Sequence, residues 1–168
     1  MRRVVWLNGA FGVGKSTVAE LLAERLGDAI VFDPELIGAG LRAERAEWRG
    51  LDDFQDIPEW RDRTRSAVSS AAVEHGTVVV VMTVHRRDYF DETVGALRDE
   101  GLPLDHFTLV ARPEVIRARL LAREGDNDWA LGRVERCVSE LAGPRFAVHV
   151  NASGSPASIA NDLAVRLA

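Results

Sequence analysis

The amino-acid sequence is short of cysteine and of apolar stretches long enough to serve a membrane. Cys137 is its only cysteine, which excludes an internal disulfide and is typical of proteins from a reducing compartment. The longest aliphatic run, residues 78–82, is far too short to cross a bilayer, and the apolar residues after Arg2 and Arg3 end too soon for a signal peptide. We therefore expect a cytoplasmic protein without a transmembrane segment.

Positive charge is also scarce. The 21 lysine and arginine residues are outnumbered by 26 aspartate and glutamate residues, which gives a formal net charge of -5. Proteins that bind nucleic acid usually present a basic face, so this balance argues against nucleic acid as the main partner.

The 168 residues, of which 46% are hydrophobic and 28% charged, suffice for one globular domain and give no indication of disorder.

Among the basic residues, lysine is the rarest. Lys15 is the only lysine of the chain, and it lies within a match to the phosphate-binding pattern G-x-x-x-x-G-K-S/T. Because arginine serves for every other positive charge, this lysine indicates a need for a compact ammonium group, as beside the β- and γ-phosphates of a nucleotide. The loop residues that we predict to bind the nucleotide are Gly9, Ala10, Phe11, Gly12, Val13, Gly14, Lys15, Ser16 and Thr17.

The sequence around this loop fits a phosphate site. Its glycines let the backbone turn successive N–H groups toward phosphate oxygens, and the start of the following helix adds partial positive charge. Ser16 would offer its hydroxyl group to Mg²⁺. An apolar run at residues 4–8 precedes the loop and a helical pattern at residues 16–26 follows it. This context favours a nucleotide site over the alternative, a glycine turn at the start of a helix.

Short apolar runs separated by helical patterns predict an α/β fold. The runs indicate buried parallel strands at residues 4–8, 29–33, 77–83, 106–111 and 146–151. Helical patterns occupy residues 16–26, 58–76, a segment from an expected cap at Asp88 to Gly101, and residues 156–167. Such alternation gives a parallel sheet with right-handed crossovers. Two segments, 44–59 and 125–129, fit neither pattern, and we expect them to be loops that cover a site.

The motifs that accompany a phosphate loop in several other protein classes are missing. The sequence contains neither Asn-Lys-x-Asp nor Asp-x-x-Gly, which disfavours a GTPase. The strand that ends at Thr83 lacks the acidic residue that an ATPase motor carries there. The acidic group that remains at a strand end is Asp33. Ligands of open α/β folds collect at that edge of the sheet.

We interpret Asp33 as the general base that accepts the proton of an attacking hydroxyl group, and as a candidate Mg²⁺ ligand through water. The alternative is that Asp33 only caps a helix, since Pro34 is typical of a first helical position. An asparagine at position 33 would still cap the helix but could not act as the base.

A pair of arginines predicts a lid. Arg119 and Arg123 are four residues apart on one face of a predicted helix, just before the polar segment 125–129. Such a pair can reach over a bound triphosphate and offset the charge that develops on a transferred phosphoryl group. The alternative is a solvated helix face on which Glu114 and Glu124 neutralise the two arginines.

With these features in place, the chain resembles the tunicamycin-resistance proteins, a branch of the small P-loop kinases related to adenylate, shikimate and chloramphenicol kinases. The resemblance runs from Val5 to about His149. It rests on Asn8-Gly9-Ala10-Phe11-Gly12, Phe32-Asp33-Pro34-Glu35, Asp53-Phe54-Gln55, Pro58 with Trp60-Arg61, Met82-Thr83, Tyr89-Phe90, His106-Phe107-Thr108-Leu109 and Arg136-Cys137-Val138. It implies a three-layer P-loop fold of the nucleotide- and shikimate-kinase type, with a five-stranded parallel sheet of order 2-3-1-4-5.

The resemblance also implies residues on the acceptor side. Arg42 is similar to the arginine that steadies the acceptor in related kinases. Phe54, Trp60, Arg61 and His85 match the resistance branch in segments where other kinases differ. The alternatives are a solvated helix charge for Arg42, core packing for the two aromatic residues and a structural role for His85.

The resemblance implies one P-loop kinase-like domain over residues 1–168, with an acceptor-binding segment at about 34–75 and a lid at about 112–136. The implied activity moves the γ-phosphate of Mg-ATP to a hydroxyl group of a small nucleoside or sugar compound, with tunicamycin as a candidate and antibiotic resistance as the outcome. Two alternatives stay open: an ATP-dependent protein that sequesters the drug without chemistry, and a metabolic small-molecule kinase. Related kinases often carry Asp-x-Asp where this chain has Asp33-Pro34-Glu35, so the role of Glu35 is open.

Overall fold

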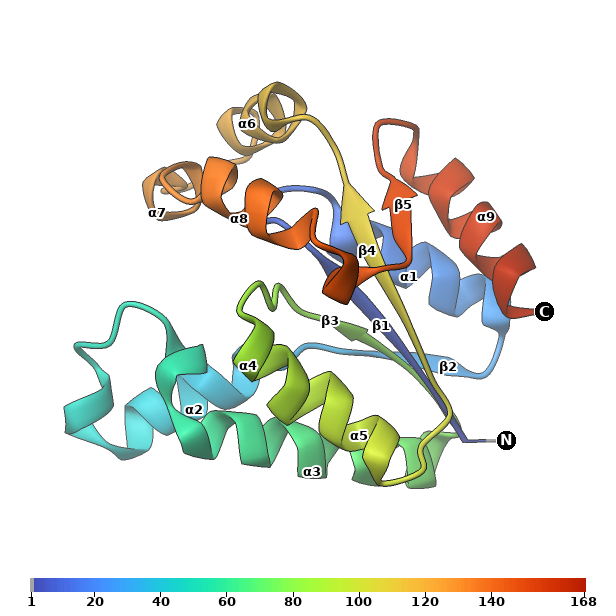
Figure 1. Cartoon of the computed structure of the whole chain (residues 1–168), viewed down its shortest axis with the longest axis horizontal. Coiled ribbons are helices and arrows are strands. Elements are labelled where there is room, and N and C mark those ends of the chain that lie inside the picture. The colour runs from blue at the N-terminus through green and yellow to red at the C-terminus, as the bar shows by residue number, and fades with distance from the viewer. Residues whose placement is uncertain (1) are drawn as a thin grey trace.

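Residues 2–168 are described by the computed structural model, in which helices cover both faces of a five-stranded parallel sheet (Figure 1). The strands are β1 (Arg3–Gly9), β2 (Ala29–Phe32), β3 (Thr77–Val81), β4 (Leu104–Val110) and β5 (His149–Asn151). Their order across the sheet is β2-β3-β1-β4-β5, and every neighbouring pair is parallel. The predicted three-layer α/β fold and the strand order 2-3-1-4-5 are confirmed.

The central strand β1 is apolar along its length because both of its faces are covered. Its residues Val4, Val5, Trp6 and Leu7 are completely buried, as expected for a parallel strand between two helical layers. Trp6 stands opposite Val80 on β3 and opposite His106 on β4. Since all five strands run in one direction, their carboxyl ends lie at one edge of the sheet, where ligands of this class of fold bind.

The two helical layers come from separate parts of the chain. The helices α1 (Lys15–Leu26) and α9 (Pro156–Leu167) pack against each other on one face of the sheet, and α3 (Pro58–His75) covers the other (Figure 1). Val18 and Leu22 of α1 and Ile159 and Leu163 of α9 are buried at helical spacing. The helices predicted at 16–26, 58–76 and 156–167 are confirmed to within about a residue at each end.

The helix predicted to run from Asp88 to Gly101 has a composite structure. It consists of α4 (Arg87–Phe90), a π-helical turn η3 (Asp91–Gly95) and α5 (Ala96–Asp99). Asp88 does not cap this helix, contrary to the expectation from the sequence, because its carboxylate is engaged elsewhere. It pairs with the guanidinium of Arg86, with 2.6 Å between Nη2 and Oδ2. The helix already begins at Arg87, so Asp88 lies in its first turn, where a negative charge is favourable to the helix dipole.

Short helical turns occupy the segments expected to be loops. The helix α2 (Glu35–Glu44) is followed by the 3₁₀ turns η1 (Ala46–Trp48) and η2 (Phe54–Asp56). After β4 come α6 (Pro113–Leu121), α7 (Asp128–Leu131) and α8 (Val134–Leu141).

The strand expected at residues 146–151 is shorter than predicted, since a further 3₁₀ turn, η4 (Pro144–Phe146), precedes it. The proline at the start of this turn favours its backbone angles.

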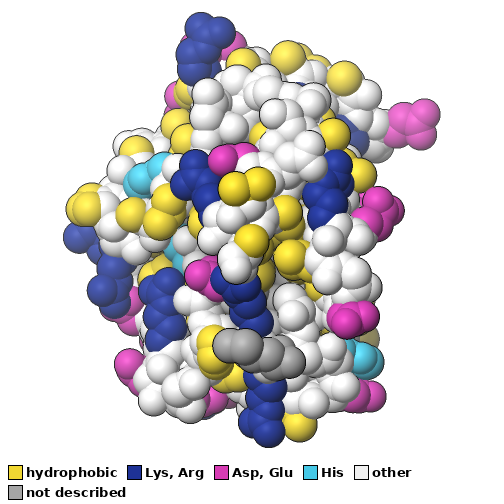
Figure 2. Space-filling model, turned by 90° about the vertical axis from the view of Figure 1, so that its right-hand side faces the viewer, with side chains coloured by type: hydrophobic (Ala, Val, Ile, Leu, Met, Phe, Trp, Pro, Cys, Tyr) yellow, Lys and Arg dark blue, Asp and Glu magenta, His cyan; other side chains and the backbone are white. Residues whose placement is uncertain are grey.

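The surface carries both signs of charge. On the face shown in Figure 2, Lys and Arg side chains are interspersed with Asp and Glu side chains. Exposed pairs such as Arg166–Asp162, 2.9 Å from Nε to Oδ2, contribute only about 0–1 kcal/mol each. Burial of large side chains such as Trp6, Trp60 and Phe90 therefore dominates stability. Among residues 2–168, no helix combines the length and the apolar character needed to cross a membrane.

A close contact between α2 and η2 gives a test of the fold. A Cβ atom at Gly38 would lie 2.5 Å from Cγ of Phe54, so we expect Gly38→Ala to lower the free energy of unfolding by about 1–3 kcal/mol through overpacking. Gly40 of the same helix has open space around it, and Gly40→Ala should raise that free energy by about 0.4–1 kcal/mol. Urea unfolding measures both, and equal effects of the two substitutions would contradict the packing described here.

Candidate active site

The phosphate loop follows β1 and passes close beneath α6. Gly12 and Gly14 have φ angles of 80° and 107°, in the region where residues with a Cβ atom are strained. At Gly12 there is also no space for a side chain, since a Cβ atom would lie 2.5 Å from Cγ of Leu120 on α6. Only glycine therefore lets the loop follow this path.

The ammonium group of Lys15 is held at the carboxyl edge of the sheet. Its Nζ donates to the carbonyl oxygens of Gly9 and Ala10, at 3.0 and 3.1 Å, and to the hydroxyl oxygen of Thr83 at 2.8 Å. Burial lowers the pKa of Lys15 to about 8, although the nearby Glu35 carboxylate favours the charged form. The ammonium group is therefore charged at neutral pH and titrates just above it.

Two residues that the sequence analysis did not select fasten the loop to the end of β3. The amide oxygen of Asn8 accepts hydrogen bonds from the N–H groups of Gly9 and Val84, at 2.8 and 2.9 Å, and its Nδ2 donates to the Val84 carbonyl. Thr83 donates its hydroxyl hydrogen to the Gly9 carbonyl at 2.8 Å. Both side chains are buried. No local sequence pattern identifies these contacts, because the residues that they join are more than seventy positions apart in the chain.

The first turn of α1 has no cap from the protein. Its N-cap residue is Gly14, which has no side chain, and the first turn holds no acidic residue. The N–H groups and the positive end of the helix dipole are thus available to an anion. Ser16 and Thr17 are exposed on the wall of the adjoining cavity. This set fits nucleotide phosphates with Mg²⁺: Lys15 would hold the phosphates and Ser16 the metal ion.

A cavity of about 890 Å³ adjoins the phosphate loop, a size typical of small-molecule sites. Its wall brings together the loop, the end of β2, part of α2, the segment 50–55 and the helices α6 and α7. The residues selected from the sequence that line it are Phe11, Gly12, Gly14, Lys15, Ser16, Thr17, Asp33, Arg42, Phe54, Arg119 and Arg123. Most of the predicted site therefore meets in one place.

Asp33 directly follows β2 and lines the cavity, and its roles as a base and as a cap both stay predictions. Its Oδ1 accepts a hydrogen bond from the N–H of Glu35 at 2.9 Å, as a capping residue does, and its side chain also lines the cavity. The second carboxylate oxygen has lone pairs to spare. Glu35 lines the same cavity, and burial, followed by the charge of Asp33, raises its pKa. Asp33-Pro34-Glu35 thus presents two carboxyl groups to one cavity.

Arg42 and Phe54 lie together on the cavity wall. The guanidinium of Arg42 donates from Nη2 to the Leu51 carbonyl at 2.8 Å and lies over the Phe54 ring, 5.4 Å from its centroid. The Nε atom of Arg42 is buried and has no hydrogen-bond partner within residues 2–168. A buried donor that is left unsatisfied costs free energy, and the rest of this residue lines the cavity.

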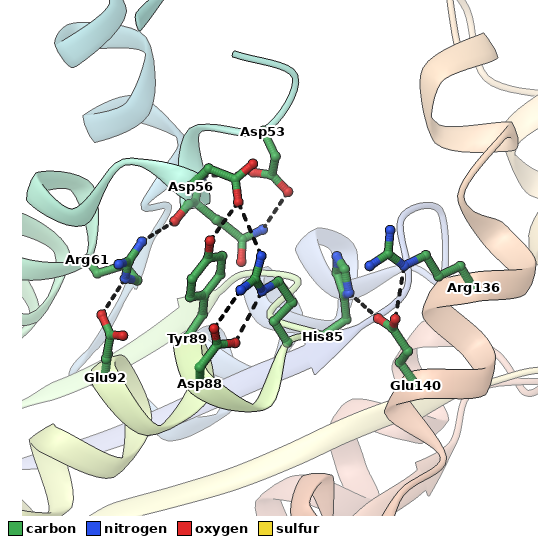
Figure 3. A network of polar contacts seen from close by, with 11 residues as sticks. Asp53, Asp56, Arg61, His85, Asp88, Tyr89, Glu92, Arg136 and Glu140 are labelled. Carbon is green, nitrogen blue, oxygen red and sulfur yellow. Dashed lines mark hydrogen bonds and ion pairs between the residues drawn. The ribbon is translucent and has the colours of Figure 1, made fainter.

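Trp60 and Arg61 do not line the cavity. Trp60 is completely buried and donates from Nε1 to the Pro34 carbonyl at 3.0 Å. Arg61 is 8% exposed; it donates from Nη1 to the Gln55 carbonyl and pairs with Glu92 (Figure 3). Both side chains support the cavity wall from behind. A direct contact of either with an acceptor stays a prediction.

His85 also lies outside the cavity wall. Its Nδ1 is in contact with the carboxylate of Glu140 on α8, which Arg136 holds from the other side at 2.9 Å (Figure 3). This pair connects the loop after β3 to the helix that follows the lid. The predicted role of His85 in binding an acceptor is therefore not matched by a position on the wall, and it too stays a prediction.

The two lid arginines have different surroundings. Arg119 donates to the Val13 carbonyl of the phosphate loop at 2.7 Å and to the Ala152 carbonyl at 2.9 Å. Arg123 lines the cavity, and within the described residues it forms no side-chain hydrogen bond or ion pair. The pairing with Glu114 and Glu124 considered from the sequence is not seen among residues 2–168. Arg119 thus anchors α6 to the loop, while Arg123 is available to a ligand.

The lid is in contact with both sides of the cavity. The ring of Trp129 on α7 meets the ring of Phe11 edge to face, with 4.8 Å between centroids. Its Nε1 donates to the Asp52 carboxylate at 3.0 Å, and Asp52 also pairs with Arg133. These contacts were not predicted from the sequence, because they join residues far apart in the chain. They hold α7 beside the phosphate loop, and the lid role of this segment stays a prediction.

Comparison with known proteins assigns this chain to a family. A family described as AAA domain matches residues 4–142. The structure of the Deinococcus radiodurans tunicamycin resistance protein is 32% identical, with a TM-score of 0.83, and the match covers 99% of this chain and 96% of that one. The chain belongs to the tunicamycin-resistance protein family. A search of curated proteins found no match.

Other members of the same fold class are kinases. A gluconokinase from Sinorhizobium meliloti is 20% identical with a TM-score of 0.69, and the match covers 99% of this chain and 94% of that one. A shikimate kinase from Bacteroides thetaiotaomicron is 17% identical with a TM-score of 0.62, and the match covers 98% and 97%. At these identities the likeness shows the fold alone. This family therefore shares a kinase-like P-loop fold with these enzymes.

The pKa of Lys15 predicts how nucleotide binding depends on pH. A phosphate is held by the charged ammonium group, and this group loses its proton as the pH rises through about 8. We expect the affinity for Mg-ATP to fall about tenfold between pH 7 and pH 9, as the protonated fraction falls. Lys15→Met should bind far more weakly, without that pH dependence. Titration calorimetry at both pH values measures this, and a pH-independent affinity of the wild type would contradict it.

Proposed function

We propose that this protein is a phosphotransferase that moves the γ-phosphoryl group of ATP, bound with Mg²⁺, to a hydroxyl group of a small nucleoside or sugar compound. Tunicamycin is the first candidate, because a relative 32% identical carries that name. The observation that supports the proposal most is that Asp33, Arg42 and Phe54 line the same cavity as Lys15. A base, an acceptor wall and a phosphate loop are thus within reach of one another.

The phosphate side of the reaction relies on Lys15, the loop N–H groups and Ser16. Lys15 would exchange its contacts with the carbonyl oxygens of Gly9 and Ala10 for contacts with the β- and γ-phosphates. Ser16 would hold the metal ion, which when bound neutralises charge on the phosphate oxygens. The uncapped start of α1 adds partial positive charge at the same point.

The acceptor side relies on Asp33. One of its oxygens stays bonded to the N–H of Glu35 and fixes the carboxylate, while the other accepts the proton of the acceptor hydroxyl group. The acceptor's hydroxyl oxygen, now without its proton, forms the new bond to the γ-phosphorus as the bond between the γ-phosphorus and the β,γ-bridging oxygen breaks, and ADP leaves. Arg123 would balance the charge that develops on the transferred group.

Water has to be kept away, because it would otherwise accept the phosphoryl group in place of the acceptor. We assign this role to a lid at about residues 112–136, whose Trp129 ring lies against Phe11. The acceptor-binding segment at about residues 34–75 forms the facing wall, where Arg42 and Phe54 lie. Both segments belong to one kinase-like domain over residues 1–168, which we propose to act in the cytoplasm on ATP and a small molecule.

The product of the reaction tests the proposal. After incubation with Mg-ATP, we expect mass spectrometry to find tunicamycin, or another compound from a panel of nucleosides and sugars, heavier by one phosphate. Asp33→Asn should lower kcat by about 10²–10⁴-fold, the usual contribution of a general base, with an unchanged melting temperature, because an amide oxygen still caps Glu35. Full activity of this variant would end the assignment of the base.

The same assay separates the rival functions. If ATP promotes the binding of tunicamycin but the drug is recovered unmodified, the protein sequesters the drug. If another alcohol gains the phosphate and tunicamycin does not, the protein is a metabolic kinase. In both cases the phosphate loop would still bind the nucleotide.

Because the two lid arginines have different surroundings, we expect their replacement by alanine to have different effects. Arg123→Ala should lower kcat by about 10²–10³-fold, as the loss of one charge-stabilising group does, with little change in melting temperature. Arg119→Ala should weaken nucleotide binding and lower the melting temperature as well, since it frees the Val13 and Ala152 carbonyls. Steady-state kinetics and thermal unfolding measure the difference. Indistinguishable behaviour of the two variants would refute the division of roles.

A further inference from the structure

Asp53 is a carboxylate on the cavity wall to which the proposed reaction gives no task. Its Oδ1 accepts a hydrogen bond from the backbone N–H of Gln55 at 2.9 Å, and its Oδ2 lies 3.3 Å from Nε2 of Gln55. The side chain lines the cavity together with Phe54 and Glu35. Within residues 2–168 no arginine, lysine or histidine forms an ion pair with it. Its remaining lone pairs are open to a hydrogen-bond donor of a ligand.

Gln55 holds this carboxylate in place. Its side chain is 2% exposed and donates from Nε2 to the Thr83 carbonyl at 2.9 Å, and its own backbone carbonyl accepts from Arg61 (Figure 3). Thr83 in turn bonds Lys15 through its hydroxyl group. The turn η2 is therefore fixed to the end of β3, and Asp53 has a set position relative to the phosphate loop.

The chemistry of this wall indicates which ligand groups it can bind. Asp53 and Glu35 offer carboxyl groups, and burial raises the pKa of Asp53, which a further negative charge would raise again. Arg42 lines the same cavity and contributes a charged guanidinium group to it. A hydroxyl group both donates and accepts, so it can satisfy a carboxylate and a guanidinium at once. A ligand carboxylate can only accept, and it would face Asp53 and Glu35 as like charges.

We propose that Asp53 is an acceptor-binding residue that accepts a hydrogen bond from an O–H or N–H group of a neutral acceptor, and that Gln55 is the residue that positions it. This inference rests on the proposed function for the existence of an acceptor. It adds a specificity: neutral polyhydroxy compounds bind, and acceptors that bear a carboxylate at this point are rejected.

The competing explanation is that Asp53 serves only as the cap of η2, since its bond to the Gln55 N–H is a cap. Asp56, three residues on, provides a matched control. It accepts from the Tyr89 hydroxyl at 2.6 Å and lies near Arg86 (Figure 3), but it is not part of the cavity wall. A change at Asp56 disturbs the same turn without touching the cavity.

The experiment measures acceptor binding separately from nucleotide binding. Calorimetry gives the affinity for a non-hydrolysable Mg-ATP analogue and then, on the saturated protein, for tunicamycin and for the pair glucose and gluconate. We expect Asp53→Asn to weaken acceptor binding tenfold or more and to change nucleotide affinity less than twofold. Asp56→Asn should change both less than twofold. The wild type should bind the neutral member of the pair in preference to the carboxylate.

A double-mutant comparison tests the positioning role. Gln55→Leu keeps the side-chain volume but removes both bonds from Nε2, so it should weaken acceptor binding threefold or more. If Gln55 acts through Asp53, the double variant should bind the acceptor no more weakly than Asp53→Asn alone. A residue needed only for stability would instead weaken binding by the same factor in both backgrounds.

Several results would overturn the inference. These are acceptor binding by Asp53→Asn at wild-type strength, an equal loss in Asp56→Asn, a preference of the wild type for gluconate, or no binding of any of these compounds. The proposed function fails in a different way: if tunicamycin binds in an Asp53-dependent manner but gains no phosphate, the phosphotransferase is refuted and the role of Asp53 stands.

Discussion

The structure depends on holding one ammonium group at the end of the central strand. Lys15 loses much of its hydration there, and this loss lowers its pKa. Two carbonyl oxygens and the Thr83 hydroxyl oxygen replace part of that hydration. Those acceptors are available only because Asn8 and Thr83 fix the loop to the neighbouring strand. The stability of β1 between two helical layers is thus the condition for a phosphate site, since the loop takes its position from the strand.

Two carboxyl groups, those of Asp33 and Glu35, share the cavity with the ammonium group of Lys15. Glu35 and Asp33 favour the charged form of Lys15, while burial, followed by the charge of Asp33, raises the pKa of Glu35. A bound polyphosphate would compete with them for the same positive charge. Lys15 and the half-buried Asp53 both line this cavity, so a bound polyphosphate and an acceptor would have to share it.

The sequence predicted what depends on neighbouring residues and failed where distant segments meet. Periodicity and a local motif were enough for the parallel strands, the main helices and the loop around Lys15, whereas the order of the strands came from the family resemblance. Asn8 and Gln55 were not selected as site residues because their partners, Val84 and Thr83, lie far along the chain. Trp60 is instructive: core packing was the alternative to an acceptor role, and the structure buries this side chain completely. Its contact with an acceptor stays a prediction.

Two contacts of unequal strength hold the segment at about residues 112–136 in place. Arg119 bonds the loop backbone through partly buried groups, and freeing such a carbonyl costs about 1–3 kcal/mol. Arg133 and Asp52 meet where the Asp52 side chain is 71% exposed, and such a pair is worth about 0–1 kcal/mol. Arg119 lies in the last turn of α6, so this end of the helix is attached to the phosphate loop more firmly than α7 is to the segment that carries Asp52.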